Sequence, residues 1–153
     1  MQAPSPKRVR KRSSSVRRFP IYEGALKDGK YHGQGVCRYN AACTYEGEFR
    51  KGKREGQGTC KYGEGDFYEG QWYQGKFHGE GSRSYRDGSS YEGQWEEGEA
   101  HGSGTCTYTD GSIYEGQWKE DERHGHGKQT KAGRVVFEGD WLRDRRVKLE
   151  CED

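Results

Sequence analysis

The sequence predicts an all-β protein. We expect an elongated, twisted single antiparallel sheet, a meander of about eleven strands made of 23-residue β-hairpin repeats, preceded by a disordered basic N-terminal tail. Alternating polar and apolar residues within each unit and turn-forming dipeptides between units both favour this fold. The strongest observation is a recurrence of an aromatic residue followed by Glu-Gly, every 23 residues and without a slip, at Tyr22, Tyr45, Tyr68, Tyr91, Tyr114 and Phe137.

The composition differs from that of an ordinary globular domain. The 153 residues are 28% hydrophobic and 34% charged, with 25 Gly but only 3 Pro and 1 Met. So few aliphatic residues are typical of disorder, but 11 Tyr, 5 Phe and 4 Trp are more aromatic residues than disordered chains carry. We therefore expect a core built from aromatic residues and glycine. No apolar run is long enough for a transmembrane helix, and none follows the N-terminus as a secretory signal requires.

Charge separates a basic tail from an acidic body. Residues 1–18 have a formal charge of +7 and no acidic residue, whereas the whole chain has +2. We predict a disordered tail over residues 1–21, the repeat array over 22–144, and a C-terminal cap or tail over 145–153. The tail residues predicted to target a membrane or an acidic partner are Lys7, Arg8, Arg10, Lys11, Arg12, Arg17 and Arg18.

Three serines, Ser13, Ser14 and Ser15, lie inside this basic run, a context that basophilic kinases favour. Phosphorylation of all three would add about 4.5 to 6 negative charges and nearly cancel the tail, which predicts an electrostatic switch. The tail suits anionic membranes, at about 1 kcal/mol for each Lys or Arg. It equally suits nuclear import, RNA or acidic tubulin surfaces, and the sequence leaves these alternatives open.

Alternation within each unit predicts two strands. In residues 91–95 (YEGQW) the aromatic residues and Gly alternate with polar residues, and residues 102–108 (GSGTCTY) alternate in the same way. Between units, Asp87-Gly88 and Asp110-Gly111 are dipeptides suited to tight hairpin turns. The connection within a unit, such as residues 51–55, is expected to be a polar loop. Short connections throughout place the strands antiparallel, in chain order.

The aromatic residues and glycines are expected to pack on one face. We number each unit from its recurring aromatic residue as position 1. Position 5 forms a column of large apolar residues, and the glycines at positions 12 and 14 are expected beside it on the same face. A strand without side chains lets an indole or phenol ring lie flat on its backbone. The residues at position 5 are Leu26, Phe49, Trp72, Trp95, Trp118 and Trp141.

The spacing Y-x-G-x-W-x-x-G-x-x-x-G-x-G resembles the MORN (membrane occupation and recognition nexus) repeat. Residues 91–111 match it at every marked position, and the resemblance covers residues 22–144. Departures lie near the ends, where atypical capping units are expected. They are Leu26 in place of an aromatic residue, Asp121 and Asp144 in place of the position-8 Gly, Lys131 in place of Tyr, and Gly133 displaced by one place.

The resemblance implies a non-enzymatic protein. It implies scaffolding at cytoskeletal, ciliary or membrane-junction structures, binding of a partner helix or peptide along an aromatic groove, and association with acidic phospholipids. Where such arrays occur in enzymes, a separate domain performs the chemistry. The residues outside the array are expected to be too few for an active site, so we predict no catalytic residue.

The aromatic face is the predicted partner-binding groove, because Tyr, Trp and Phe are the residues most enriched in binding hot spots. An amphipathic helix or an extended apolar peptide suits such a channel. We expect a column of tyrosines near the turns to be accessible, with tryptophans beneath it. The predicted groove residues are Tyr39, Tyr62, Tyr85, Tyr108, Trp72, Trp95 and Trp118.

Metal binding is a weaker interpretation of the recurring histidines and cysteines. Equivalent residues of adjacent units are two strands apart, about 9–10 Å, which is too far for shared ligation of one zinc ion or for a disulfide. We therefore predict no metal and no other cofactor, and an odd number of cysteines fits a reducing intracellular compartment. The residues in question are His32, His78, His101, His124, Cys37, Cys60 and Cys106.

The glutamates of the recurring Glu-Gly form a row on the face opposite the aromatic residues. We expect them to be solvated and balanced by cross-strand neighbours such as Arg38 and Lys61. A further hypothesis is that the basic tail folds back on this row. At the C-terminal end, residues 142–149 are predicted to form a short amphipathic helix, with Leu142, Arg145, Arg146 and Leu149 on one face.

We therefore predict a non-catalytic scaffold or adaptor that binds a partner helix or peptide. One alternative is a phosphoinositide-directed or acidic-phospholipid membrane tether driven by the tail, and a second is a regulatory subunit of a separate enzyme. Nucleic acid is disfavoured as a partner, and homo-oligomerisation is left open. The predicted location is cytoplasmic, at the cytoskeleton or cilium, with the membrane periphery and the nucleus as alternatives.

Overall fold

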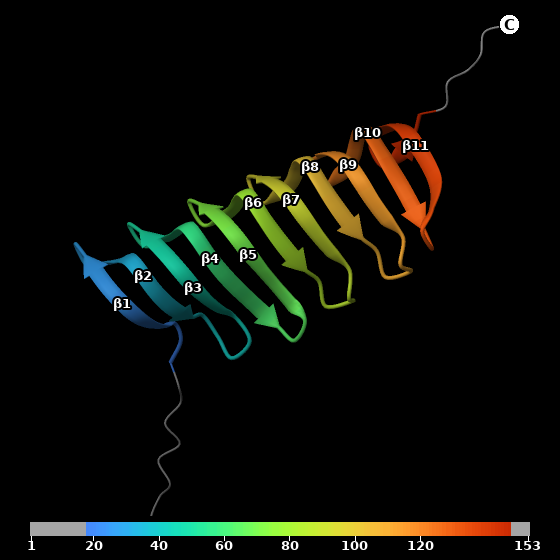
Figure 1. Ribbon diagram of the computed structural model, residues 1–153. Helices are drawn as coiled ribbons and strands as arrows, with labels where there is room; N and C mark the ends of the chain where they lie inside the picture. Colours follow the sequence, from blue (N-terminus) through green and yellow to red (C-terminus); the bar gives the residue numbers. More distant parts are fainter. Residues whose placement is uncertain (1–17, 148–153) are drawn as a thin grey trace, which may run out of the picture.

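A computed structural model describes residues 18–147, which form one open antiparallel sheet of 12 strands in chain order (Figure 1). The predicted all-β meander is thus confirmed, with eleven long strands and a short twelfth. None of the described residues forms a helix that could cross a membrane. The strands are β1 (Ile21–Lys27), β2 (Lys30–Arg38), β3 (Thr44–Arg50), β4 (Lys53–Gly63), β5 (Asp66–Tyr73), β6 (Lys76–Ser84), β7 (Ser90–Glu96), β8 (Glu99–Thr107), β9 (Ile113–Lys119), β10 (Glu122–Lys131), β11 (Arg134–Leu142) and β12 (Arg145–Arg146).

Tight turns lie both within the units and between them. Between β7 and β8, Glu97 (φ 52°) and Gly98 (φ 93°) both adopt the left-handed backbone that a two-residue hairpin turn needs. The turn at Asp87-Gly88 spans residues 86–88 and is closed by the Gly88 N–H, which donates to the Tyr85 carbonyl (2.9 Å). The Asp87 carboxylate also accepts hydrogen bonds from the Ser89 N–H (2.9 Å) and hydroxyl (2.6 Å). Only Gly88 has a positive φ there, and the loop at Asp110-Gly111 is built in the same way. The predicted hairpin turns with a positive φ at Asp87-Gly88 and Asp110-Gly111 are therefore confirmed.

A row of glycines crosses the sheet perpendicular to its strands. Gly93 is paired with Gly81 on one neighbouring strand and with Gly104 on the other. A β-carbon at Gly93 would lie 2.5 Å from both the Gly104 Cα and the Ser103 carbonyl oxygen, so a larger residue does not fit between these backbones. The row comprises Gly24, Gly35, Gly47, Gly58, Gly70, Gly81, Gly93, Gly104, Gly116, Gly127 and Gly139.

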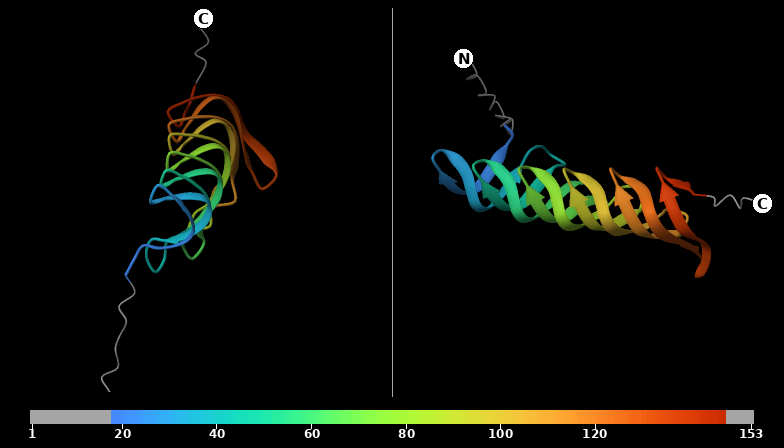
Figure 2. Two further views of the ribbon diagram at one scale, coloured as in Figure 1. Left: turned by 90° about the vertical axis from the view of Figure 1, so that its left-hand side faces the viewer. Right: turned by 90° about the horizontal axis from the view of Figure 1, so that it is seen from above.

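Each strand bends at this row toward its aromatic face. Tyr91 and Trp95 are four residues apart on β7, so in a straight strand they would be separated by about 13 Å. Their ring centroids are only 4.9 Å apart, because the strand folds over at Gly93. The aromatic face is consequently concave, and the strands curve around the long axis of the array (Figure 2).

Tyrosine rings, rather than indoles, cover the glycines. A β-carbon at Gly104 would lie 2.2 Å from the Tyr91 hydroxyl oxygen, whereas the Trp95 indole lies beyond it and its Nε1–H donates to the Gly81 carbonyl (3.0 Å). The position-12 glycines lie beside the position-5 column, since Gly102 is paired with Trp118 on the next strand. Gly102 (φ 64°) lies in a bulge, and its β-carbon would meet the Gln94 side chain, which points away from the rings. Both glycine positions therefore adjoin the aromatic column as predicted, but a β-carbon would meet a ring only at position 14.

The buried core is one continuous file of side chains along the concave face. Tyr91 contacts both Trp95 of its own unit and Trp118 of the next unit edge-to-face, with centroids 4.9 and 5.2 Å apart. Each unit is therefore stabilised by burial against its neighbours. The buried apolar residues are Cys37, Tyr45, Phe49, Cys60, Tyr68, Trp72, Phe77, Tyr91, Trp95, Ala100, Cys106, Tyr114, Trp118 and Trp141.

The predicted helix over residues 142–149 was wrong. Leu142 ends β11, a turn with positive φ at Arg143 (48°) and Asp144 (63°) follows, and Arg145 then pairs with Leu142 in β12. The repeat pattern continues here, because the Arg146 guanidinium lies 4.8 Å from the Phe137 ring centroid on the concave face. Residues 148 and 149 lie outside the described residues.

Candidate binding groove

Four tyrosines at position 18 lie in line along the concave face, close to the loops between units. Tyr39 is 36% exposed, and Tyr62, Tyr85 and Tyr108 are half-buried. The Arg83 guanidinium lies 5.0 Å from the ring centroids of both Tyr62 and Tyr85, which places these two tyrosines side by side. The structure therefore brings the predicted tyrosines together as one surface, which we call the tyrosine rail.

The predicted tryptophans lie beneath this rail. Trp72 and Trp95 are almost fully buried, and Trp118 is 8% exposed. Each indole Nε1–H donates to the carbonyl of a glycine in the preceding unit, at 2.9 Å for Trp72, 3.0 Å for Trp95 and 3.1 Å for Trp118. Each of these indole N–H groups is therefore hydrogen-bonded. Because the three rings are buried beneath the tyrosine rail, they form the floor of the groove.

Arginines also occupy the groove, and the sequence interpretation missed them. The Arg54 guanidinium lies 4.3 Å from the Trp72 ring centroid, and Arg123 lies 4.3 Å from that of Trp141. These distances are typical of cation–π contacts. The available signal was position 10, which shares the alternation of the aromatic face and holds Tyr31, Arg54, Phe77, Ala100, Arg123 and Arg146.

The groove arginines have different partners. Arg83 Nη2 is 3.1 Å from Asp66 Oδ1, and Arg123 Nε is 2.8 Å from Asp144 Oδ1. Arg54 instead donates to the Gly75 carbonyl (2.8 Å), and no carboxylate of residues 18–147 pairs with it. Burial raises the pKa of the Tyr39 phenol to about 12, although the Arg54 charge opposes the shift. The groove at neutral pH thus combines neutral phenols with fixed positive charges.

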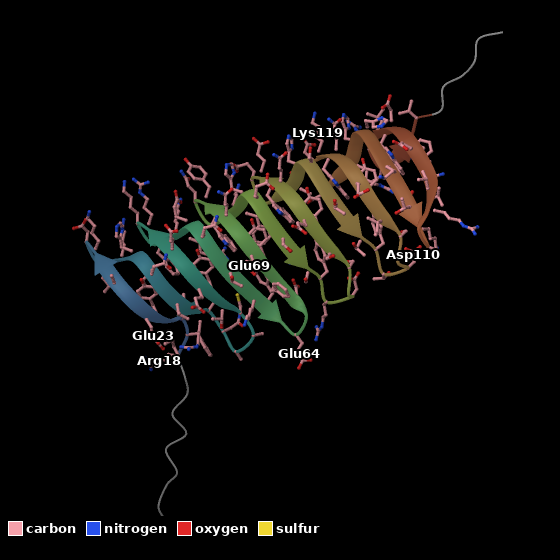
Figure 3. All side chains as sticks on the ribbon, viewed as in Figure 1. Arg18, Glu23, Glu64, Glu69, Asp110 and Lys119 are labelled. Atoms are coloured by element: carbon pink, nitrogen blue, oxygen red, sulfur yellow. The ribbon has the colours of Figure 1, made fainter. Side chains whose placement is uncertain are left out.

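The opposite, convex face carries the glutamate row. Glu23, Glu46, Glu69, Glu92, Glu115 and Glu138 are all exposed. Glu23 and Glu69 lie on the first strands of their units, while Glu64 and Asp110 mark the loops along one edge of the ribbon and Lys119 the other edge (Figure 3). Arg38 Nη1 is 2.7 Å from Glu23 Oε1, as expected of a balancing neighbour. At 45% and 65% side-chain exposure, this pair contributes little to stability.

Among residues 18–147, the remaining predicted residues form no second cluster of metal-ligating groups. His101 Nε2 lies 3.3 Å from Glu96 Oε2, and within residues 18–147 no three metal-ligating side chains converge. Arg18 is exposed. The other tail residues that were singled out lie outside the described part of the chain: Lys7, Arg8, Arg10, Lys11, Arg12, Arg17, Ser13, Ser14 and Ser15.

This geometry defines a class of protein, an open single-sheet β-repeat array with a concave aromatic face. Comparison with known protein families finds the MORN repeat at residues 22–41, 45–67, 68–90, 91–113 and 114–133. The match covers more than half of the chain, which therefore belongs to the MORN repeat family. These repeats are generally non-enzymatic binding modules for membranes or proteins. Comparison with curated proteins finds no match.

Proposed function

We propose that the protein is a non-catalytic scaffold or adaptor that binds an amphipathic helix or extended peptide of a partner protein along the tyrosine rail. The observation that carries this proposal is the composition of the concave face, where half-exposed phenols alternate with arginines held over aromatic rings. Tyr and Arg are the side chains, after Trp, that contribute most to protein interfaces. Because these side chains are already ordered, little conformational entropy is lost when a partner binds.

The shape of the groove favours an elongated partner. The rail has one tyrosine in each of four successive units, so a helix or strand lying along the array meets chemically similar contacts at a regular spacing. An adaptor of this kind fits a cytoplasmic location at a cytoskeletal, ciliary or membrane-associated structure.

A photo-crosslinking experiment tests the proposal. Benzoylphenylalanine is placed at Tyr85 or Tyr108 on the concave face, and at Glu92 or Glu115 on the convex face, in the full chain expressed in cells. We expect crosslinks to a protein segment from the tyrosine positions and none from the glutamate positions. The reverse pattern would place the binding site on the convex face and contradict the proposal.

The captured segment is then synthesised as a peptide, and its affinity for the protein and its variants is measured. Tyr85→Ala is expected to weaken its binding by about 2 kcal/mol, whereas Glu92→Ala leaves it unchanged. Tyr85→Phe is the matched control, since it keeps the ring. Circular dichroism establishes that each variant is folded, so that a loss of affinity is not a loss of structure.

A second candidate function is tethering to anionic membranes, favoured by the +7 charge of residues 1–18. It is tested with vesicles of phosphatidylcholine containing a few per cent of phosphatidylinositol bisphosphate. Salt-sensitive binding that disappears on deletion of residues 1–18, together with an absence of groove crosslinks, would make lipid the principal ligand. Vesicle binding that survives the deletion would contradict a tail-driven tether.

A further inference from the structure

The concave face is hollowed at the fourth unit. The hollow has a volume of about 320 Å³, and its walls include the rail tyrosines Tyr85 and Tyr108, the floor residue Trp118, Ala100 and the carboxylate-bearing Asp121. Arg123 and Asp144 also border it, and they pair with each other at 2.8 Å (Nε to Oδ1), so the Arg123 charge is balanced. We call this cavity the Ala100 hollow.

A single small residue creates this hollow. At position 10 of other units a large side chain covers the ring found 18 residues later: Phe77 lies 5.3 Å from Trp95, and Arg54 lies 4.3 Å from Trp72, measured to the ring centroids. Ala100 holds the same position in the fourth unit, and its methyl group is too short to cover Trp118. Trp118 is accordingly more exposed, at 8%, than Trp72 at 3% or Trp95 at 4%.

The next unit shows what a filled site looks like. The Arg123 guanidinium lies 4.3 Å from the Trp141 ring centroid. The Asp144 Oδ1 accepts hydrogen bonds from the Arg123 backbone N–H (3.0 Å) and from its Nε–H (2.8 Å), while Arg123 Nη2 donates to the Asp144 carbonyl (3.1 Å). An indole and an aspartate thus hold one guanidinium between them.

The fourth unit keeps this frame without the guanidinium. The Asp121 Oδ1 accepts from the Ala100 backbone N–H (2.7 Å), and the Asp121 N–H donates to the Ala100 carbonyl (3.1 Å), as the Asp144 N–H does to that of Arg123 (3.1 Å). Asp121 and Trp118 therefore hold the places of Asp144 and Trp141. Within residues 18–147, no Lys, Arg or His forms an ion pair with Asp121.

We propose that the Ala100 hollow binds the guanidinium of an arginine side chain carried by the partner segment. The partner's guanidinium then occupies, between Trp118 and Asp121, the place that the Arg123 guanidinium occupies between Trp141 and Asp144. Asp121 accepts its N–H groups, Trp118 stacks beneath its plane, and Tyr85 and Tyr108 flank it. A planar, delocalised cation suits this arrangement better than the compact, strongly hydrated ammonium of lysine. The inference rests on the proposed function, since it names one anchor of the partner in the groove.

The test is a titration of the ¹⁵N-labelled full chain with the peptide acetyl-Gly-Arg-Gly-amide, followed by NMR. We expect a saturable shift of the Trp118 indole N–H and none at Trp72. The same peptide with citrulline in place of arginine, a neutral isostere, should bind about tenfold more weakly, because the charged hydrogen bond is lost. Equal affinity for the two peptides would overturn the proposal.

Two substitutions sharpen this test. Asp121→Asn should weaken the arginine peptide about tenfold, while Glu92→Gln on the convex face is the matched control and should leave its affinity unchanged. Ala100→Arg places the chain's own guanidinium in the hollow, as Arg54 and Arg123 do in their units. It should abolish peptide binding and raise the thermal midpoint. Undiminished peptide binding by Ala100→Arg would overturn the proposal.

The result is distinguishable from failure of the proposed function. The tripeptide is too short to occupy the groove, so an arginine-selective shift is independent of the crosslinking pattern, and either can fail alone. The titration is repeated with the protein lacking residues 1–18, for which we expect the same affinity. Binding that tightens more than about tenfold on this deletion would assign the hollow to the chain's own arginine-rich tail and overturn a partner arginine.

Discussion

The two faces of this one-layer sheet share every strand but differ in nearly every other respect. On the concave face, Tyr91 and Trp95 are buried and touch each other because β7 folds over at Gly93. On the convex face, Glu92 lies between them in the sequence and is exposed. The difference shows that a single sheet can bury a core by bending, without a second layer, provided that the bend is made of glycine.

The bend also separates structural from binding contributions. The convex residues supply exposed charges, whereas the concave residues supply both the buried core and the tyrosine rail. We therefore expect substitutions to have large effects at the glycine row, intermediate effects at the buried phenols and small effects on the glutamate row.

The largest effect is expected at the glycine row. Gly93→Ala places a β-carbon 2.5 Å from backbone atoms of Gly104 and Ser103, which no side-chain rearrangement relieves. We expect a loss of about 3 kcal/mol or more in the free energy of unfolding, measured with urea. Ser103→Ala, at an exposed neighbouring position, is the control and should change it by less than about 0.5 kcal/mol. Similar unfolding midpoints for the two variants would contradict the packing described.

The next effect concerns the buried phenols and pH. Burial raises the pKa of Tyr114 to about 12 from an ordinary value of 10, and it raises that of Tyr91 as well. Since the folded state keeps these protons longer than the unfolded state, their contribution to stability is complete below pH 10 and is lost as pH rises toward 12. Urea midpoints should therefore fall through this range, with tyrosinate absorbance appearing in two steps. A single ionisation step near pH 10 in protein that remains folded would contradict the burial.

The smallest effect is expected on the convex face. Glu92→Ala removes an exposed carboxylate, so the free energy of unfolding should change by less than about 0.5 kcal/mol. Urea denaturation measures it, with Tyr91→Ala, on the same strand but on the concave face, as the contrast. A loss at Glu92 comparable to that at Tyr91 would mean that the two faces are equally structural.

The sequence predicted the sheet well because its period is unbroken and its alternation is clear. It did not predict which ring lies on glycine, since alternation assumes a straight strand and does not reveal the bend at Gly93. The turn at Asp87-Gly88 could be predicted because it has a typical hairpin composition. The tight turn at Glu97-Gly98 could not, because it depends on a Glu adopting a positive φ.

The tyrosine rail could be predicted from its column, but its cations could not. Arg54 and Arg123 share the alternation of the aromatic residues, yet a charged side chain in such a pattern is usually solvated. Only the stacking distances reveal that these arginines belong to the concave face. The sequence did not predict the Ala100 hollow either. A small residue at position 10 indicates a hollow only once the structure shows that large residues at this position in other units cover a ring.

The most direct test of the account is the NMR chemical shift of the Gly104 Cα protons. If the Tyr91 ring lies on this glycine and bends the sheet into a groove, one of these protons will be shifted far upfield by the ring current. The Cα protons of Gly98, which has open surroundings, will keep ordinary glycine values. Ordinary shifts at Gly104 would mean that the ring does not cover the backbone, and would contradict the concave face on which the proposed binding depends.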